Sequence, residues 1–363
     1  MEHHRSKFWV AFVALSVFVT QYVLAEPELS YPSVDASLGE YLHSDEQHHA
    51  LAIGDIVEKD IRDRYAESII QRDAHPKAHG CPVAQFKVLD DIPEHLQAGV
   101  FQPGAVYDTV VRFSNGSPNA KQADAKGDTR GMAIKLSGVV GAKLVDIDSQ
   151  ADHQDFLLIS HPVFFVNDAE DYAEFFEITA SGQWWRWLKL PFVLGVRGSY
   201  NAYQMLRKKI DNPLATRYWS VVPYQLGEGK LKQLVKYSAK PCQPLTANDG
   251  VSTEQDDYLR AAMTSTLESA SACMSFMVQE IPRGDYSVED VVSRWPEDKS
   301  PFNVVAELHF KPQVFDSDDQ LERCEAMAFN PWHGLEAHRP LGAVNRIRKV
   351  VYDRIRRIRQ SSY

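Results

Sequence analysis

The spacing of apolar residues changes from a helical period to a strand period along the first half of the chain. Residues 49–71 place apolar side chains three to four positions apart, which predicts an amphipathic helix. From residue 83 the period becomes two, and short apolar runs alternate with clusters of turn-forming residues. The predicted strands in this half are 83–88, 105–113, 131–136, 155–159 and 163–166.

The second half of the chain contains further helices and strands. The predicted elements are helices at 168–181, 182–212 and 341–361, strands at 231–238, 272–278 and 304–310, and a loop at 331–340. Closely spaced strands joined by turns indicate an antiparallel sheet or barrel. The order of helix, strands, helices, strands and helix therefore predicts an α+β fold.

The N-terminus has the pattern of an export signal. Arg5 and Lys7 precede the uncharged, mostly apolar residues 8–24, and the small residue Ala25 follows. This pattern predicts a secretory signal peptide over residues 1–25 and a single domain over residues 26–363. The alternative is an uncleaved membrane anchor, which would hold the protein close to a membrane. Either interpretation predicts an exported protein, periplasmic or secreted.

The net charge argues against a nucleic-acid partner, and the cysteine spacing argues against a zinc site. The net charge of −10 argues against nucleic acid, which requires a basic surface. The spacing of the four cysteines fits no zinc motif. Export permits disulfides, and one bridge is compatible with this count, although the sequence leaves the pairing open. The cysteines are Cys81, Cys242, Cys273 and Cys324.

Three segments are rich in side chains that can take part in catalysis or ligand binding: 72–81, 112–135 and 348–359. In the third segment, Arg348 and Tyr352 are spaced i and i+4 and share one face of the predicted helix. A cation beside a tyrosine lowers the cost of ionising its phenol, and a tyrosinate can ligate ferric iron. A solvated basic helix face is the simpler interpretation of this segment taken alone.

Together the three segments resemble the catalase superfamily. Six motifs occur in the order of that family: Arg72-Asp73-Ala74-His75-Pro76-Lys77, Arg112-Phe113-Ser114, Asp128 through Lys135, Asp155 followed by Pro162-Val163-Phe164-Phe165, Ala328-Phe329-Asn330-Pro331, and Arg348 with Tyr352 and Arg359. The resemblance implies a catalase-like antiparallel β-barrel with flanking helices. It also implies a C-terminal helix that carries a haem-ligand tyrosine.

The resemblance implies haem b as the cofactor and Tyr352 as the ligand of its iron. Arg348 would keep this tyrosine ionised, and Arg359 would lie nearby. Tyr352 would then push electron density towards the iron and favour cleavage of the O–O bond.

On the opposite face of the haem, the resemblance implies that His75 is the distal acid–base residue and that Ser114 orients it. Arg72 and Arg112 would pair with the haem propionates, for which a forked guanidinium is suited. Tyr172 stands where the family has a phenylalanine that stacks on the haem. His79 competes with His75 for the distal role, but the Arg and Lys neighbours of His75 match the family motif.

The sequence departs from the family pattern in two places. Ser160 stands where catalases have a distal asparagine, and its side chain has a shorter reach. The chain also ends eleven residues after Tyr352, so the later domains of long catalases are not expected. Both features resemble the small catalase-related haem peroxidases and the catalase-like allene oxide synthases.

The resulting hypothesis is a haem-dependent peroxidase with weak catalase activity that acts on hydrogen peroxide or organic hydroperoxides. One alternative is a lipid hydroperoxide isomerase that needs no external reductant. Another is an envelope protein that binds haem without turnover, which the departure at Ser160 motivates. No motif identifies the electron donor.

Overall fold

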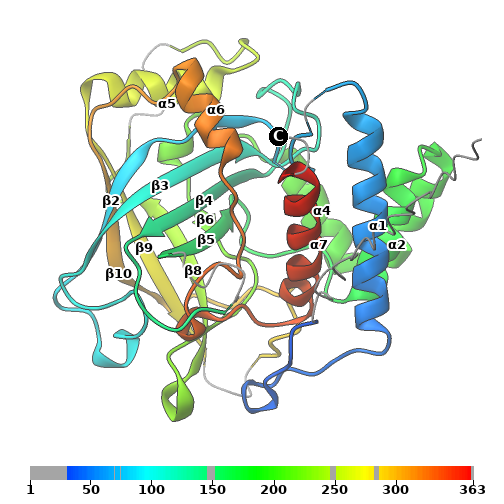
Figure 1. Cartoon of the computed structure of the whole chain (residues 1–363), viewed down its shortest axis with the longest axis horizontal. Coiled ribbons are helices and arrows are strands. Elements are labelled where there is room, and N and C mark those ends of the chain that lie inside the picture. Colours follow the sequence, from blue (N-terminus) through cyan, green and yellow to red (C-terminus); the bar gives the residue numbers. More distant parts are fainter. Residues whose placement is uncertain are drawn as a thin grey trace, which may run out of the picture. The chain divides into compact units, whose positions relative to one another are not determined.

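A closed antiparallel β-barrel of eight strands forms the centre of the structure (Figure 1). Around the barrel the strands follow the order β3, β2, β10, β9, β8, β6, β5, β4, and β4 pairs with β3 to close it. Their bounds are β2 Val83–Val88, β3 Val106–Asn115, β4 Arg130–Ser137, β5 His153–Ile159, β6 Tyr218–Trp219, β8 Gln233–Pro241, β9 Ala272–Glu280 and β10 Phe302–Phe310. Two short strands, β1 (Ala78–Gly80) and β7 (Tyr224–Leu226), pair with β3 and β8, respectively. The predicted α+β class and antiparallel barrel are confirmed.

This computed structural model describes residues 31–68, 70–73, 75–144, 152–245, 251–281 and 286–360. The predicted signal peptide, residues 1–25, lies outside these ranges. In the part of the chain that is described, no helix is long and apolar enough to cross a membrane.

Aromatic side chains fill the interior of the barrel. Phe156 lies 4.9 Å from Phe276 and 5.0 Å from Tyr237 between ring centroids, and all three side chains are buried. The period of two along each strand places every second side chain inside the barrel. This alternation is why the sequence predicts these strands. Because the interior is a packed core, the polar candidate residues must act from outside it.

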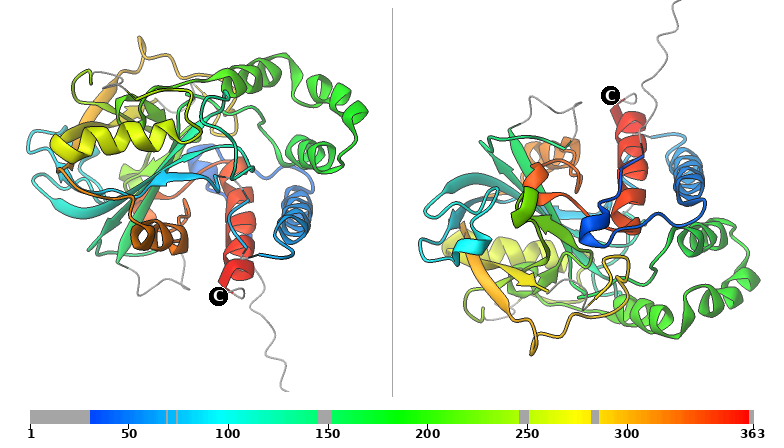
Figure 2. Two further views of the ribbon diagram at one scale, coloured as in Figure 1. Left: turned by 90° about the horizontal axis from the view of Figure 1, so that it is seen from above. Right: turned by 90° about the horizontal axis from the view of Figure 1, so that it is seen from below.

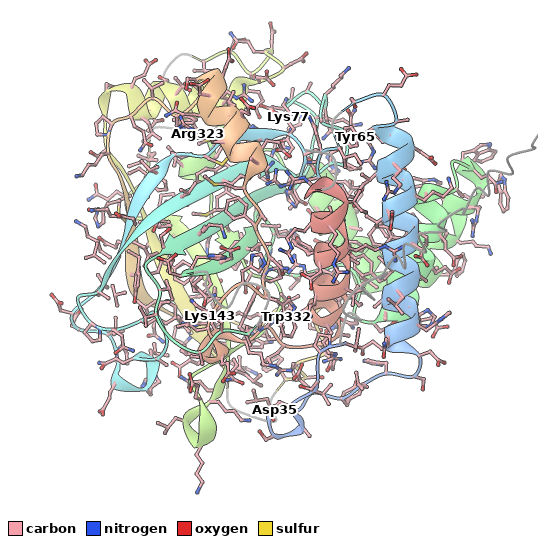
Figure 3. All side chains as sticks on the ribbon, in the orientation of Figure 1. Asp35, Tyr65, Lys77, Lys143, Arg323 and Trp332 are labelled. Carbon is pink, nitrogen blue, oxygen red and sulfur yellow. A yellow bond between two sulfur atoms is a disulfide. The ribbon has the colours of Figure 1, made fainter. Side chains whose placement is uncertain are left out.

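Three helices form a second layer beside the barrel. They are α1 (Glu46–Arg64), α2 (Ala169–Ala180) and α7 (Ala343–Gln360), which contact one another through a separate apolar cluster. Figure 2 shows that α7 lies between the barrel and α1. At the N-terminal end of α7, Trp332 donates a hydrogen bond from Nε1 to the carbonyl of Asn345 at 2.8 Å (Figure 3).

The other helices lie at the edges of the barrel. Helix α2 is followed by η4 (Trp184–Lys189), α3 (Leu190–Val193) and α4 (Gly195–Arg207). Helices α5 (Tyr258–Ser269) and α6 (Asp318–Ala326) both contact β1. Short 3-10 turns lie at Ala36–Leu38, Glu94–Leu96, Pro213–Ala215, Gly229–Leu231 and Glu336–His338.

The predicted strand at 163–166 is wrong. This segment forms no strand, and Pro162 before it lacks the N–H group that a central strand would need. Phe164 instead accepts a hydrogen bond from Asn201 Nδ2 at 2.8 Å, and its own amide bonds to Val291 O. The run is apolar because it is buried in the main core, and a short apolar run does not identify the backbone conformation.

Two disulfides are present rather than the single bridge considered from the sequence. Cys242–Cys273 joins the ends of neighbouring strands β8 and β9. Cys81–Cys324 joins the turn after β1 to α6, across 243 residues of sequence. Among the described residues no cysteine is free.

We expect the Cys81Ser/Cys324Ser variant to lose more stability than the Cys242Ser/Cys273Ser variant. Removing a native disulfide typically costs about 2–5 kcal/mol, and the chain-entropy cost rises with loop length. The separations of 243 and 31 residues correspond to a difference of about 2 kcal/mol between the variants. Urea denaturation would measure it, and equal midpoints with equal slopes would contradict the prediction.

Candidate active site

His75 is held against the outer wall of the barrel by two residues of β3. Its Nδ1 lies 3.0 Å from Ser114 Oγ, and Arg112 Nη2 donates to the His75 carbonyl at 2.8 Å. Because Arg112 and Ser114 are two positions apart on one strand, both side chains point to the same face. The His75 backbone has a φ of 61°, a conformation that is uncommon for a residue with a side chain and that occurs often at functional sites.

Gly131 makes room for the His75 ring. It pairs with Ser114 in the β3–β4 ladder, and a Cβ atom at this position would lie 2.5 Å from His75 Nδ1 and 2.8 Å from Ser114 Oγ. Residue 131 must therefore be glycine for the His75–Ser114 pair to form. The sequence places this glycine within the Asp128–Lys135 motif, which does not by itself indicate its role.

The environment of His75 keeps its imidazole neutral. Burial, together with the positive charges of Arg112 and Arg348, lowers the pKa of His75 to about 3. At neutral pH the ring can therefore accept a proton on the nitrogen that does not face Ser114. This is the protonation state that a distal base requires.

His79 lies in a different environment. It is buried on β1, and its Nδ1 is 3.8 Å from Asp124 Oδ2. Asp124 also pairs with Lys77 at 2.9 Å and accepts a hydrogen bond from Asn115 at 2.9 Å. Lys77 further bonds Gln122 O and Asp256 O, so this network joins two loops to β1. The geometry favours His75 over His79 as the distal residue.

Three of the predicted cofactor-binding arginines converge on one carboxylate. Glu325 on α6 lies 2.6 Å from Arg72 Nη1, 3.6 Å from Arg112 Nη2 and 3.2 Å from Arg359 Nη2. Burial lowers the pKa of Arg112 to about 10, which leaves it charged at neutral pH. Forked guanidinium groups gathered in this way form a binding site for carboxylates.

Sequence reasoning missed Glu325 because α6 was not predicted. The available signal was a capping box, in which Ser317 and Gln320 bond to each other at the start of α6. The neighbouring residue Cys324 forms the disulfide with Cys81, so the bridge holds α6 beside the segment that contains His75.

Tyr352 lies half-buried on α7, one turn after Arg348. Nη1 of Arg348 and the hydroxyl of Tyr224 are buried, and neither has a hydrogen-bond partner in the described ranges of the chain. Burial raises the pKa of Tyr224 to about 12. The positive charge of Arg348 lowers this pKa, and Tyr352 raises it. An unsatisfied buried polar group costs about 1–3 kcal/mol, so this group of residues is suited to receive a polar or charged ligand.

Tyr172 connects this region to the aromatic core. Its ring packs against Phe164 at 5.7 Å, Phe165 at 6.0 Å and Phe176 at 4.9 Å. Burial raises the pKa of the Tyr172 hydroxyl, and the positive charge of Arg348 lowers it by a smaller amount. An aromatic surface therefore lies close to the predicted iron ligand.

The hydrogen bonds of Ser160 join it to Arg130 and not to His75. Ser160 Oγ instead accepts from the backbone N–H of Arg130 at 2.9 Å, and its own N–H donates to Arg130 O at 2.8 Å. The short serine side chain reaches the neighbouring strand β4 and extends no further. The catalytic role of Ser160 stays a prediction, and this geometry shows a structural role for its hydroxyl as an acceptor.

The residues present fit a haem. The arginine cluster formed by Arg72, Arg112 and Arg359 would bind its propionates, and Tyr352 beside Arg348 would bind its iron. The donor set contains a neutral histidine, a phenol and carboxylate-binding arginines, which are the groups that a tyrosinate-ligated haem requires. The predicted site residues other than Ser160 are thus compatible with one cofactor, although they come from segments far apart in the sequence.

Comparison with known proteins gives a consistent result. The catalase family model matches residues 45–181, a range that includes His75, Ser114 and Tyr172. Among solved structures, catalase A from Saccharomyces cerevisiae is similar at 20% identity with a TM-score of 0.63, over 81% of this chain and 62% of that chain. A fungal catalase is similar at 19% identity and TM-score 0.60, over 80% and 58%. A bacterial catalase is similar at 17% identity and TM-score 0.55, over 88% and 61%.

The chain thus spans about three fifths of the length of these catalases. At such identities the likeness establishes the fold, and the predicted catalase-like barrel is confirmed. The family match also confirms the resemblance inferred from the motifs.

Proposed function

We propose that this catalase-related chain, which has the catalase fold, is a haem-dependent peroxidase that reduces hydrogen peroxide or organic hydroperoxides. Family and fold support an oxidoreductase of the peroxidase type. The observation that carries the finer proposal is the neutral His75, held by Ser114 and Arg112 near a carboxylate-binding arginine cluster.

In this proposal His75 moves the proton of the substrate. The neutral imidazole takes a proton from the hydroperoxide and returns it to the oxygen that leaves. Ser114 and the Arg112–carbonyl bond hold the ring in one orientation, so the proton transfer does not require a search over rotamers. When bound, a haem would supply the redox chemistry that these side chains lack.

Residues of α7, together with Arg72 and Arg112, would hold the cofactor. Tyr352 would bind the iron as a phenolate, with the positive charge of Arg348 one helical turn away. Arg72, Arg112 and Arg359 would hold the propionates, and Glu325 positions these three guanidinium groups relative to one another.

The test is the absorption spectrum after reconstitution with haem, for the wild-type protein and for Tyr352→Phe. We expect a Soret band with high-spin ferric features, which the variant loses or shifts because phenylalanine offers no oxygen ligand. Tyr107→Phe is the control and should keep the wild-type spectrum, because this half-buried ring packs against Phe86 on the core side of β3, at the end of the strand away from Ser114. A wild-type protein that shows no Soret band would exclude the haem and all the site assignments that depend on it.

We further propose that the protein acts outside the cytoplasm. The two disulfides support this location, because disulfides persist in oxidising compartments. The N-terminal sequence pattern supports it independently. Fractionation of cells expressing the chain, with N-terminal sequencing of the product, would test export and cleavage after Ala25 together.

Gly131→Ala tests the assigned geometry of the distal side. The added methyl group would meet the His75 ring at 2.5 Å and displace it, and a displacement of about 1 Å can lower a rate about 100-fold. We expect kcat/KM for hydrogen peroxide to fall by that order while the Soret band remains. Wild-type activity in this variant, measured with an unchanged melting temperature, would mean that His75 does not occupy the assigned position during turnover.

A further inference from the structure

The segment that follows α2 exposes an unusual amount of apolar surface. Nine large apolar or aromatic side chains between residues 184 and 206 are 50–91% exposed: Trp184, Trp185, Trp187, Leu188, Phe192, Val196, Tyr200, Tyr203 and Leu206. They occupy the consecutive elements η4, α3 and α4, and we refer to them as the aromatic face. Figure 2 shows these helices, in green, at the edge of the protein. A concentration of large exposed apolar side chains in one segment is typical of an interaction site on a soluble protein.

Helix α4 has the reverse of the usual amphipathic arrangement. Its buried residues are Gly198 and Asn201. Asn201 Nδ2 donates to Phe164 O at 2.8 Å and to Val292 O at 3.0 Å, and a Cβ atom at residue 198 would lie 2.3 Å from Phe165 O. A small residue and an amide therefore fix α4 to the core, together with the partly buried Met205. Val196, Tyr200 and Tyr203, spaced for one helix face, are left facing solvent.

The side chains of the two preceding elements are at most half-buried. Within their described residues, η4 and α3 contain no buried side chain. Since the segment is held to the core through α4 and the partly buried Leu194 and Met205, the nine exposed side chains make no comparable contribution to the fold. They therefore need another explanation.

The charge of this segment opposes that of the whole chain. Residues 182–209 contain six Lys and Arg residues and no Asp or Glu, whereas the chain carries a net charge of −10. The six cations are Arg186, Lys189, Arg197, Arg207, Lys208 and Lys209. Lysine is depleted in the cores of protein interfaces, whereas Trp and Tyr mixed with Lys and Arg are typical of the interface of an anionic membrane.

We propose that the aromatic face is a docking surface for an anionic lipid bilayer. The Trp, Phe, Leu and Val side chains would enter the boundary between headgroups and acyl chains, and the six cations would contact the anionic headgroups. The protein would lie on the membrane through this face and would not span it.

The face is also connected to the candidate active site. Gly198 of α4 contacts the carbonyl of Phe165, and the Phe165 ring packs against Tyr172 at 6.0 Å. At the other end of α4, the backbone N–H of Asp128 donates to Lys208 O at 2.9 Å. Docking would therefore bring the site close to the bilayer. The substrates within its reach would then be lipid hydroperoxides, which we infer to be its substrate class. This second step rests on the proposed peroxidase function, whereas docking itself does not.

Quenching of tryptophan fluorescence by brominated lipids tests docking. The experiment uses the full chain with Trp9→Phe, so that Trp184, Trp185 and Trp187 are the tryptophans nearest to the bilayer. Vesicles would contain brominated phosphatidylcholine with or without phosphatidylglycerol. We expect quenching with the anionic vesicles, weaker quenching in high salt, and little quenching with phosphatidylcholine alone.

The matched variants separate this face from exposed apolar residues elsewhere. Leu188Ser/Phe192Ser/Val196Ser removes side chains that are 68%, 87% and 91% exposed, and we expect vesicle affinity to fall at least about 100-fold. Val140Ser/Leu231Ser removes side chains that are 90% and 86% exposed and should bind like the parent. Equal quenching in all three proteins would overturn the proposal. So would light scattering that shows the parent as a dimer and the triple variant as a monomer, since a second copy would then cover the face.

Turnover distinguishes the two steps. If both hold, the triple variant reduces a phospholipid hydroperoxide in anionic vesicles at least about 10-fold more slowly than the parent, with unchanged turnover of hydrogen peroxide. Quenching without turnover of any hydroperoxide would remove the peroxidase proposal and leave docking intact. Equal turnover of the vesicle substrate by parent and variant would overturn the assignment of lipid hydroperoxides as the substrate class.

Discussion

Replacement of His75 by glutamine is expected to lower kcat/KM for hydroperoxides about 100- to 10,000-fold without removing the haem. Glutamine is neutral and similar in length, but it cannot take a proton and return it, which is the contribution of a general acid–base residue. Haem binding should persist because the iron ligand and the propionate-binding arginines lie on other elements. Stopped-flow kinetics with hydrogen peroxide, beside the Soret spectrum of the same sample, would measure both properties.

Ser114→Ala and His79→Gln are the matched controls for this experiment. Ser114→Ala removes the oxygen 3.0 Å from His75 Nδ1 and should lower the rate to a smaller extent, because the base remains. His79→Gln removes a buried residue of the Asp124 network and should affect stability more than turnover. A larger loss of turnover in His79→Gln than in His75→Gln would reverse the assignment of the distal residue.

The pH dependence of turnover gives a second test of His75. Its pKa of about 3 lies below the usual value of about 6.5, so its imidazole stays neutral as the pH falls from 8 to 5. We therefore expect kcat/KM to show no inflection near pH 6.5. An inflection there, absent from His75→Gln, would mean that the ring is more exposed to solvent than the structure shows.

Arg346→Met is expected to destabilise the fold by about 3–5 kcal/mol. The Arg346 side chain is completely buried and bonds Glu46 at 2.6 Å, Glu40 at 2.9 Å and Glu289 at 3.1 Å. The variant removes the cation that Glu46, Glu289 and Glu40 share and leaves Glu40 with its second partner, Arg339, at 2.7 Å. Because this network attaches the N-terminal end of α7 to the residues before and within α1, the loss would also loosen the helix that carries Tyr352.

The loss at Arg346 should depend on pH with a defined sign. In the wild-type protein, burial raises the pKa of Glu46, and hydrogen bonds from Arg346 and Tyr31 more than offset this, so the pKa lies below its usual value. That contribution to stability is present at neutral pH and is lost as the pH falls through the lowered pKa. Without Arg346 burial dominates, the pKa rises, and the variant should become more stable as the pH falls from 7 towards 5.

Urea denaturation at pH 7 and pH 5 would measure both effects. Arg354→Met is the control, because Arg354 pairs with Asp55 and Glu58 near the surface and should contribute at most about 1 kcal/mol. An Arg346→Met protein as stable as this control would mean that the buried network stabilises the fold no more than apolar packing would.

The elements that the sequence predicted correctly are those with a strong internal period. The prediction at 83–88 coincides with β2, and those at 105–113 and 131–136 fall within one or two residues of the ends of β3 and β4. The final helix was predicted at 341–361 and forms as α7. A half-buried element records its period directly in the alternation of apolar and polar residues, so no knowledge of its neighbours is needed.

Predictions based on short or composite segments were less accurate. The helix predicted at 49–71 ends at Arg64, and the segment predicted as one helix at 182–212 forms three shorter pieces. Helices α5 and α6 were missed. Both helices are short, and both pack against elements that are distant in the sequence, such as β1.

The sequence by itself determined the fold class, the candidate distal residue and the candidate iron ligand, because each of these lies within a local pattern or motif. Only the tertiary structure decided that Arg72, Arg112 and Arg359 meet at Glu325, that Gly131 admits the His75 ring, and that the Ser160 hydroxyl is bound to β4. It also decided that the apolar side of α4 faces solvent while Gly198 and Asn201 face the core. The physical reason is that a period or motif describes a residue relative to its near neighbours in sequence, whereas these contacts join residues far apart in the chain and exist only after the barrel has closed.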